Sequence, residues 1–253
     1  MNINDNEVIQ YTQKDGVAII TLNRPKAYNA LSKALSAGII KYIKQAEAED
    51  TVKVIVITGN GKAFCAGVDL KEVATATDGL GDDTALINIF NHRKKPMIGA
   101  INGFCITGGL ELALSCDFRY ASENAVFADT HTKVGLMPTW GMSQKLPRLI
   151  GMDRAKEMSF SGRKIDAETA LAWGLVNRVF PAEQLLPETL QLATEIAGNN
   201  QTALAGMKEL MDTGASLPLN EALDFEYKTS HAHNDALNLS GMLDKLNEVR
   251  GKK

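Results

Sequence analysis

Two glycine-bearing segments of the chain contain residues that could bind an anion or carry out acid–base chemistry. They read Ala63-Phe-Cys-Ala-Gly-Val-Asp-Leu70 and Asn102-Gly-Phe-Cys-Ile-Thr-Gly-Gly-Leu-Glu-Leu112. In the second, small residues lead directly into a predicted helix, so free N–H groups at its start could face a ligand. An anion, or an oxygen that becomes anionic during a reaction, is the natural guest. For either segment alone, glycines that merely permit tight turns explain the pattern at least as well.

Two other patterns resemble functional motifs but fail in their details. Residues 59–62 begin like a phosphate loop, yet Ala63 follows the lysine where Ser or Thr is required, and the spacing lacks its first glycine. His231 and His233 lie two residues apart, which puts them on different sides of a helix rather than on one metal-binding face. We therefore expect no metal site and no separate cofactor.

The composition is that of a globular protein. The 253 residues are 45% hydrophobic and 23% charged, and the net charge of -3 comes without any block of like charges. Nucleic acid and acidic membrane surfaces are therefore not expected partners. The three cysteines form no CxxC pair, and the first residues are polar and acidic rather than basic and apolar. These features predict a cytoplasmic protein without a disulfide framework.

Strand and helix signals alternate along the first part of the chain, which predicts α/β layers. The expected strands cover residues 17–22, 54–58, 96–101 and 126–127. The expected helices cover residues 29–49, 83–91 and 108–115. From about Met142 onward the signals are nearly all helical, with amphipathic stretches at 202–213, 218–237 and 240–249. The prediction is an α/β core over residues 1–197 and a helical region over residues 198–253.

Together and in this order, the two glycine segments resemble the enoyl-CoA hydratase/isomerase (crotonase) superfamily. That family carries A-F-x-A-G-x-D-[IL] after a strand and, further along, N-G-x-x-x-G-G-x-E-L at the start of a helix. Residues 23–31 also match its N-R-P-x-x-x-N-A-[LM] segment, and residues 135–144 and 162–177 match further family segments. The likeness spans about residues 8–200. It weakens afterwards, where the tail 246–253 lacks the family's usual F-x-E-K-R-x-P ending.

The resemblance implies a spiral of ββα repeats followed by helices that serve assembly into a homotrimer or a dimer of trimers. The implied ligand is an acyl-CoA thioester, with CoA as part of the substrate. The family's oxyanion hole uses one N–H group from each glycine segment, and these positions fall on Ala66 and Gly108. One such donor stabilises an enolate-like transition state by about 3–4 kcal/mol. Other positions match the family's substrate or CoA path: Lys26, Ala27, Tyr28, Ala63, Gly67, Val68, Asp69, Leu70, Gly109 and, as a wall of the acyl pocket, Trp140.

The proton chemistry departs from the family pattern at one position. Hydratases of this family typically use two glutamates around the water that adds to the double bond, and the first corresponds to Glu111. A Glu there could also simply favour the start of the helix. The second position holds His131, whose imidazole can give or take a proton at neutral pH. In one scheme Glu111 activates water while His131 donates a proton to the α-carbon, or the two roles are reversed; Asp129 is a further candidate carboxylate.

The sequence is compatible with three functions. The leading hypothesis is hydration of a trans-2-enoyl-CoA to a 3-hydroxyacyl-CoA. The first rival is a Δ3,Δ2-enoyl-CoA isomerase or another single-base reaction, in which one carboxylate moves a proton between C2 and C4. The second rival is a non-catalytic acyl-CoA-binding protein. Loss of the second glutamate favours this last reading, whereas the intact glycine segments argue against it.

Overall fold

The computed structural model describes residues 7–75 and 83–237. The predicted helix at 240–249 and the tail at 246–253 lie outside these ranges. Contacts divide the chain into two compact units, Met1–Asn199 and Asn200–Lys253. The boundary expected from the sequence lies between residues 197 and 198. Each unit is described here by itself.

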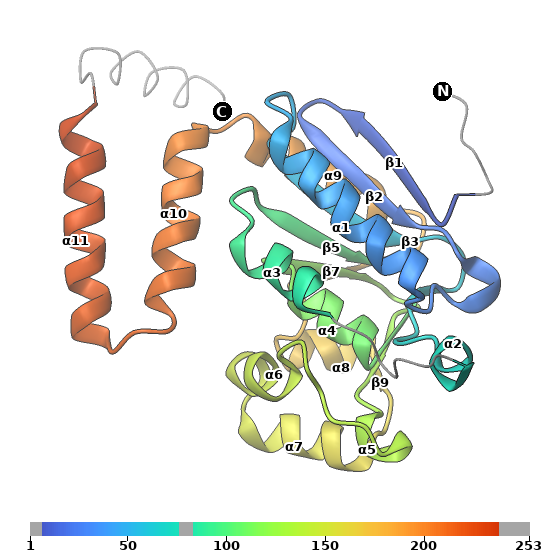
Figure 1. The fold of residues 1–253 in the computed structure, drawn as a ribbon. Helices are drawn as coiled ribbons and strands as arrows, with labels where there is room; N and C mark the ends of the chain where they lie inside the picture. The colour runs from blue at the N-terminus through green and yellow to red at the C-terminus, as the bar shows by residue number, and fades with distance from the viewer. Residues whose placement is uncertain (1–6, 76–82, 238–253) are drawn as a thin grey trace. The chain divides into compact units, whose positions relative to one another are not determined.

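The first unit contains a sheet of six strands in the order β1-β2-β3-β5-β7-β10 (Figure 1). Its strands are β1 (Ile9–Lys14), β2 (Val17–Leu22), β3 (Val54–Gly59), β5 (Met97–Ile101), β7 (Phe118–Ser122) and β10 (Arg178–Phe180). The β1–β2 pair is antiparallel and the other pairs are parallel. Strand β5 is buried along its whole length, as is typical of a parallel strand covered on both faces.

The two faces of this sheet are covered by different helices. In β3, Ile55 and Ile57 belong to the larger hydrophobic cluster, which also contains Leu35 and Ile39 of helix α1 (Lys33–Ala48). Val54 and Val56 point to the opposite face, because side chains alternate along a strand. There they join the smaller cluster with Leu185 and Ala193 of helix α9 (Leu185–Ala197).

A second, smaller sheet has the order β4-β6-β8-β9. Its strands are β4 (Ala63–Cys65), β6 (Phe104–Ile106), β8 (Val126–Ala128) and β9 (Ile165–Asp166). Strands β3, β5 and β7 of the large sheet are each followed directly by β4, β6 and β8 of the small one, and then by helix. The helices after these pairs are α2 (Leu70–Thr75) with α3 (Thr84–His92), α4 (Gly108–Leu114) and α5 (His131–Val134). Three ββα units thus advance along two sheets, which confirms the predicted spiral.

Among the described residues, four further helices belong to the first unit. They are the 3-10 helix η1 (Pro25–Ala27), α6 (Met142–Ile150), α7 (Met152–Ser161) and α8 (Ala167–Ala172), of which α8 contacts strands β8 and β9 of the small sheet. The prediction of an almost entirely helical chain after Met142 is wrong for β9 and β10, which are too short to show an alternating pattern. Helix α1 begins at Lys33, because the Ser32 side chain accepts the Leu35 N–H and caps it there, four residues later than expected.

The second unit is a helical hairpin of α10 (Gln201–Gly214) and α11 (Leu219–Asp235). Neither helix has a fully buried residue. Large apolar side chains of the pair are exposed: Met207, Met211, Leu219, Leu223 and Tyr227. Within the described residues, no helix has the length and apolar character needed to cross a membrane.

Candidate active site

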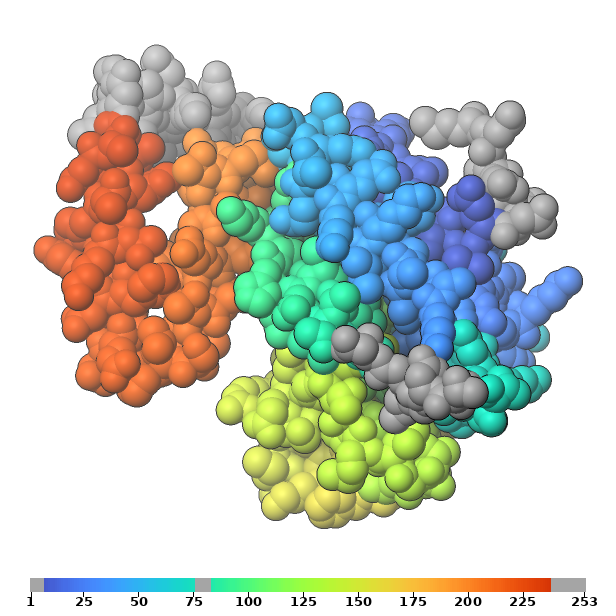
Figure 2. All heavy atoms as spheres, in the orientation of Figure 1, coloured from blue at the N-terminus to red at the C-terminus, as the bar shows by residue number. Residues whose placement is uncertain are grey.

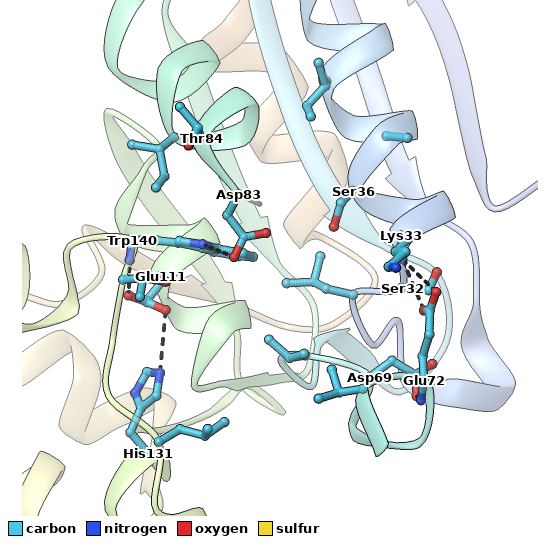
Figure 3. Close-up of a pocket in the computed structure, with 18 of the residues that line it drawn as sticks. Ser32, Lys33, Ser36, Asp69, Glu72, Asp83, Thr84, Glu111, His131 and Trp140 are labelled. Atoms are coloured by element: carbon cyan, nitrogen blue, oxygen red, sulfur yellow. Dashed lines mark hydrogen bonds and ion pairs between the residues drawn. The ribbon is translucent and has the colours of Figure 1, made fainter. Parts of the chain in front are cut away.

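A cavity of about 670 Å³ lies between α1, α3, the segment after β4 and residues 136–140 (Figure 3). Figure 2 shows the surface of the same elements in the orientation of Figure 1. Five of the residues singled out from the sequence line this cavity: Val68, Asp69, Glu111, His131 and Trp140. The structure thus brings the two predicted acid–base residues into one cavity.

Glu111 is held in place by backbone hydrogen bonds from a distant loop. Its Oε1 accepts the N–H of Trp140 at 2.8 Å and that of Met142 at 3.3 Å. The residue is only 3% exposed, and burial raises the pKa of its carboxyl, although these N–H groups and His131 oppose the shift. One oxygen therefore fixes the side chain, while Oε2 faces His131 (Figure 3).

The helix that carries Glu111 can only reach this place because its second residue is glycine. A Cβ on Gly109 would lie 2.0 Å from the carbonyl oxygen of Cys65. That distance is far inside van der Waals contact, so helix α4 and strand β4 pack backbone to backbone here. Gly109, matched to the substrate path from the sequence, thus positions Glu111 by packing.

His131 lies between two carboxylates. Its Nε2 is 3.7 Å from Glu111 Oε2, and its Nδ1 is 2.7 Å from Asp129 Oδ1. Burial alone would lower the pKa of His131, but the hydrogen bond and charge of Asp129, with the charge of Glu111, outweigh it and raise the pKa. Burial alone would raise the pKa of Asp129, and hydrogen bonds from His131 and Ser159 lower it instead. The arrangement favours an imidazolium beside Glu111.

The N–H group of Ala66 is not free to bind an oxyanion, because it donates to the carbonyl oxygen of Tyr28 at 3.0 Å. This corrects the position matched from the sequence. Val68 and Leu31 form an isolated parallel β-bridge. In this bridge the Leu31 N–H donates to Gly67 O, and the Asp69 N–H donates to Leu31 O. Since successive N–H groups of an extended segment point in opposite directions, the Val68 N–H points away from Leu31.

The N–H groups of Val68 and Gly108 lie close to each other. A Cβ on Gly108 would be 3.5 Å from Val68 N, and one on Gly67 would be 3.3 Å from Gly108 N. Gly67 also has a φ of 92°, which favours glycine. Within the described residues, no protein acceptor binds either N–H group. Val68 and Gly108 are therefore the pair that could bind one oxygen.

The residue before Gly108 has a backbone conformation that is unusual for a residue with a side chain. Thr107 has φ 52° and ψ −110°, a region sparsely populated by residues with a side chain. Its Oγ1 lies 2.5 Å from the hydroxyl of Thr130 and accepts the Thr130 N–H at 3.0 Å. These bonds hold the orientation of the Gly108 N–H and tie this loop to the residue that precedes His131.

Comparison with protein-family models identifies one match, the enoyl-CoA hydratase/isomerase family, over residues 12–246. The chain belongs to the enoyl-CoA hydratase/isomerase family. It is 36% identical over 221 residues to a short-chain-enoyl-CoA hydratase of Clostridium acetobutylicum, and the match covers 85% of each chain. It is 38% identical over 215 residues to a mitochondrial enoyl-CoA hydratase of Pongo abelii, covering 84% of this chain and 74% of the relative.

Solved structures of this family agree with the fold. A crystal structure of an enoyl-CoA hydratase from Bacillus anthracis superposes with a TM-score of 0.87 at 34% identity, covering 95% of this chain and 96% of that one. The resemblance stated from the glycine segments is therefore confirmed for the family and for the fold.

The residues matched to the CoA path of the enoyl-CoA hydratase/isomerase family divide into exposed and buried groups. Lys26 and Tyr28 are exposed, with Ala27 between them partly buried, and the Tyr28 ring meets Phe104 edge-on at 6.1 Å. Asp69 forms an ion pair with Arg24 at 2.9 Å, which orders the loop. Ala63 is fully buried in β4, so its side chain is not available to a ligand. Leu70 is half exposed at the start of α2.

The cavity wall formed by helices α1 and α3 was not predicted from the sequence. Ser36 and Ile40 lie one turn apart on α1, and Thr84 and Ile87 lie one turn apart on α3. The spacing of these residues is visible in the sequence. Which face of each helix turns to the cavity is decided by long-range packing.

Proposed function

We propose that this protein is an enoyl-CoA hydratase, adding water to a trans-2-enoyl-CoA to give a 3-hydroxyacyl-CoA. The observation that carries the proposal is the facing pair of Glu111 Oε2 and His131 Nε2, 3.7 Å apart. That separation is too long for a direct hydrogen bond and allows one water molecule to contact both groups. The Val68 and Gly108 N–H groups supply the place for the thioester oxygen.

The reaction follows from these groups in two proton transfers. Glu111 takes a proton from the water as its oxygen bonds to C3, and the electron pair of the double bond moves toward the thioester. The oxygen of the resulting enolate accepts the two N–H groups, each worth about 3–4 kcal/mol in such a site. His131 then gives its proton to C2, and a water molecule between the two groups relays the proton from Glu111 to His131, which restores the imidazolium.

The directions of the pKa shifts bear on this division of roles. Asp129 raises the pKa of His131, which favours the charged imidazole that acts as the acid. Burial raises the pKa of Glu111, and the N–H groups of Trp140 and Met142 oppose that shift and favour the carboxylate that acts as the base. Because the two groups interact, the measured pKa values belong to the pair. The reversed assignment, with His131 as the base and Glu111 as the acid, would first require a proton to move from His131 to Glu111.

Hydration is favoured over isomerisation by the number of proton-handling groups. Moving a proton between C2 and C4 needs one base, whereas adding water needs a group that takes a proton and another that gives one. The cavity places two such groups face to face. The chemistry proposed uses only proton transfer and N–H donors, so it requires no metal or cofactor, and CoA enters as part of the substrate.

We also propose that the CoA moiety runs along residues 26–28 and 63–70 and that the protein assembles as a homotrimer or a dimer of trimers. Exposed Tyr28 offers a ring, and Lys26 and Lys164 offer cations for phosphate groups. The apolar side chains exposed on α10 and α11 support burial of this hairpin in an assembly. Sedimentation velocity at several concentrations tests the assembly. A cytoplasmic location stays a prediction from the sequence.

A steady-state assay with crotonyl-CoA and a 3-enoyl-CoA tests the reaction. We expect the purified protein to consume crotonyl-CoA and form 3-hydroxybutyryl-CoA, with much slower conversion of the 3-enoyl thioester. Faster turnover of the 3-enoyl-CoA would make isomerisation the main activity. Turnover of neither thioester, combined with tight binding of butyryl-CoA, would show a binding protein.

A further inference from the structure

The side chain of Trp140 is hydrogen-bonded to the residue that precedes helix α3. Its indole Nε1 donates a hydrogen bond to Asp83 Oδ2 at 3.0 Å. Trp140 is only 6% exposed, and Asp83 immediately precedes α3 without capping it through its side chain. Figure 3 shows the indole extending toward Asp83, and a dashed line joins the two side chains. The two side chains thus connect walls of the cavity that come from distant parts of the chain.

This connection lies directly beyond the reacting groups. The backbone N–H of Trp140 binds Glu111 at 2.8 Å, so the tryptophan is anchored at the place where water would be activated. In Figure 3 Thr84, Asp83, Trp140, Glu111 and His131 follow one another down one side of the cavity. Ile87 lies one helical turn beyond Thr84, and Ile40 faces the same cavity from α1. In Figure 3 the Trp140–Asp83 pair thus lies between Glu111 and Thr84, and Ile87 follows one turn further along α3.

We propose that the hydrogen bond between Trp140 and Asp83 is a clasp that limits the acyl chain to short lengths. The inference rests on the proposed function, because the double bond must lie at Glu111 for its tail to point at the indole. A four-carbon chain ends at the indole ring. A longer chain reaches Ile40 and Ile87 only by displacing the ring.

Displacement of the ring is unfavourable for two physical reasons. Displacing the ring breaks the one charge-assisted hydrogen bond between the indole N–H and the Asp83 carboxylate, and it leaves the buried N–H without this acceptor. An apolar chain passing Asp83 would also remove water from its carboxylate without replacing the lost bond. A chain that stops before the clasp avoids both costs. Asp83 thus acts as a positioning residue, and Trp140 as the residue that contacts the substrate.

The experiment measures kcat and KM for trans-2-enoyl-CoA substrates of four, six, eight and ten carbons. The variants are Trp140→Leu, Trp140→Phe, Asp83→Ala and Asp83→Asn, with Asp153→Ala as a control at an exposed carboxylate of α7. All retain the backbone N–H of residue 140 that binds Glu111. Far-ultraviolet circular dichroism and thermal unfolding identify any variant that fails to fold.

The readout is the ratio of kcat/KM for the eight-carbon substrate to that for the four-carbon substrate. We expect this ratio to rise about tenfold or more in Trp140→Leu, in the range typical of changes in an apolar pocket. It should rise less in Trp140→Phe and Asp83→Ala, mainly through KM of the longer substrates. It should stay near the wild-type value in Asp83→Asn, whose amide oxygen can still accept the indole N–H, and in Asp153→Ala.

Two results would overturn the clasp. One is a wild-type enzyme that already prefers the eight-carbon substrate, and the other is an unchanged ratio in both Trp140→Leu and Asp83→Ala. If no enoyl thioester turned over, the proposed function would fail by itself. The clasp would then be tested by calorimetric binding of butyryl-CoA and octanoyl-CoA, where Trp140→Leu must selectively strengthen octanoyl-CoA binding. Equal effects on the two ligands would contradict it.

Discussion

Replacing Glu111 by glutamine separates the chemical role of this residue from its structural role. Oε1 accepts two backbone N–H groups, from Trp140 and Met142, while Oε2 faces His131. The amide oxygen of a glutamine can accept the same two N–H groups, so the loop at 140–142 keeps its anchor. Only the ability to take a proton from water is lost. Glu111→Gln is therefore a nearly isosteric removal of the base.

The expected loss follows from that single missing step. A positioned general base contributes about 10²–10⁴-fold in rate. We expect kcat/KM for crotonyl-CoA to fall by that factor, or about 3–5 kcal/mol of transition-state stabilisation. Affinity for butyryl-CoA, which carries no double bond, should change little. Glu111→Ala should lose stability as well, because each N–H group left buried without an acceptor costs about 1–3 kcal/mol.

The assay combines steady-state hydration, calorimetric binding of butyryl-CoA and thermal unfolding. The matched control is Glu168→Gln, which changes an exposed carboxylate at the start of α8. It should match the wild type in all three measurements. A Glu111→Gln enzyme that folds, binds butyryl-CoA and keeps more than a tenth of wild-type kcat/KM would refute the role of Glu111 as base.

Two further predictions concern the surroundings of Glu111. Asp129→Asn removes the charge that raises the pKa of His131, so the alkaline limb of the kcat/KM profile should move to lower pH; an unmoved limb would contradict the pairing. Gly109→Ala places a Cβ 2.0 Å from Cys65 O and should lower the free energy of unfolding by about 1–3 kcal/mol or more. Gly206→Ala in α10 should instead be neutral or stabilising in urea titrations, because a Cβ added there would meet no described residue within 4 Å apart from its chain neighbours and the backbone of its own helix. Equal effects of the two substitutions would argue against the close packing at Gly109.

Much of the fold could be predicted because its signals are local. The buried strand 54–58 reads as a continuous apolar run, and the two glycine segments mark the turns where backbones approach closely. The shortest strands, at 165–166 and 178–180, carry two or three residues and no detectable period. They form because neighbouring strands offer unpaired edges, which is a property of the assembled sheet.

The residues of the site also divide into those that local sequence predicts and those that long-range contacts determine. Glu111 and His131 could be placed from their spacing within matched segments, and they meet in one cavity. The donor pair could not be placed from the sequence, because long-range pairing decides which N–H group of the segment stays unbonded. The Ala66 N–H donates to Tyr28 O, whereas the pairing of the segment with Leu31 leaves the Val68 N–H without a partner among the described residues. The Trp140–Asp83 bond joins residues 57 positions apart and leaves no trace in a local pattern.

The pH dependence of crotonyl-CoA hydration in the wild type and in His131→Gln tests the central claim most directly. Glutamine keeps a polar side chain but cannot carry the proton that C2 receives. The wild type should show a bell-shaped kcat/KM profile, limited on the acid side by Glu111 and on the alkaline side by His131. In His131→Gln, kcat/KM should fall about 10²–10⁴-fold and the alkaline limb should disappear. An active variant with the wild-type alkaline limb would show that another group supplies the proton.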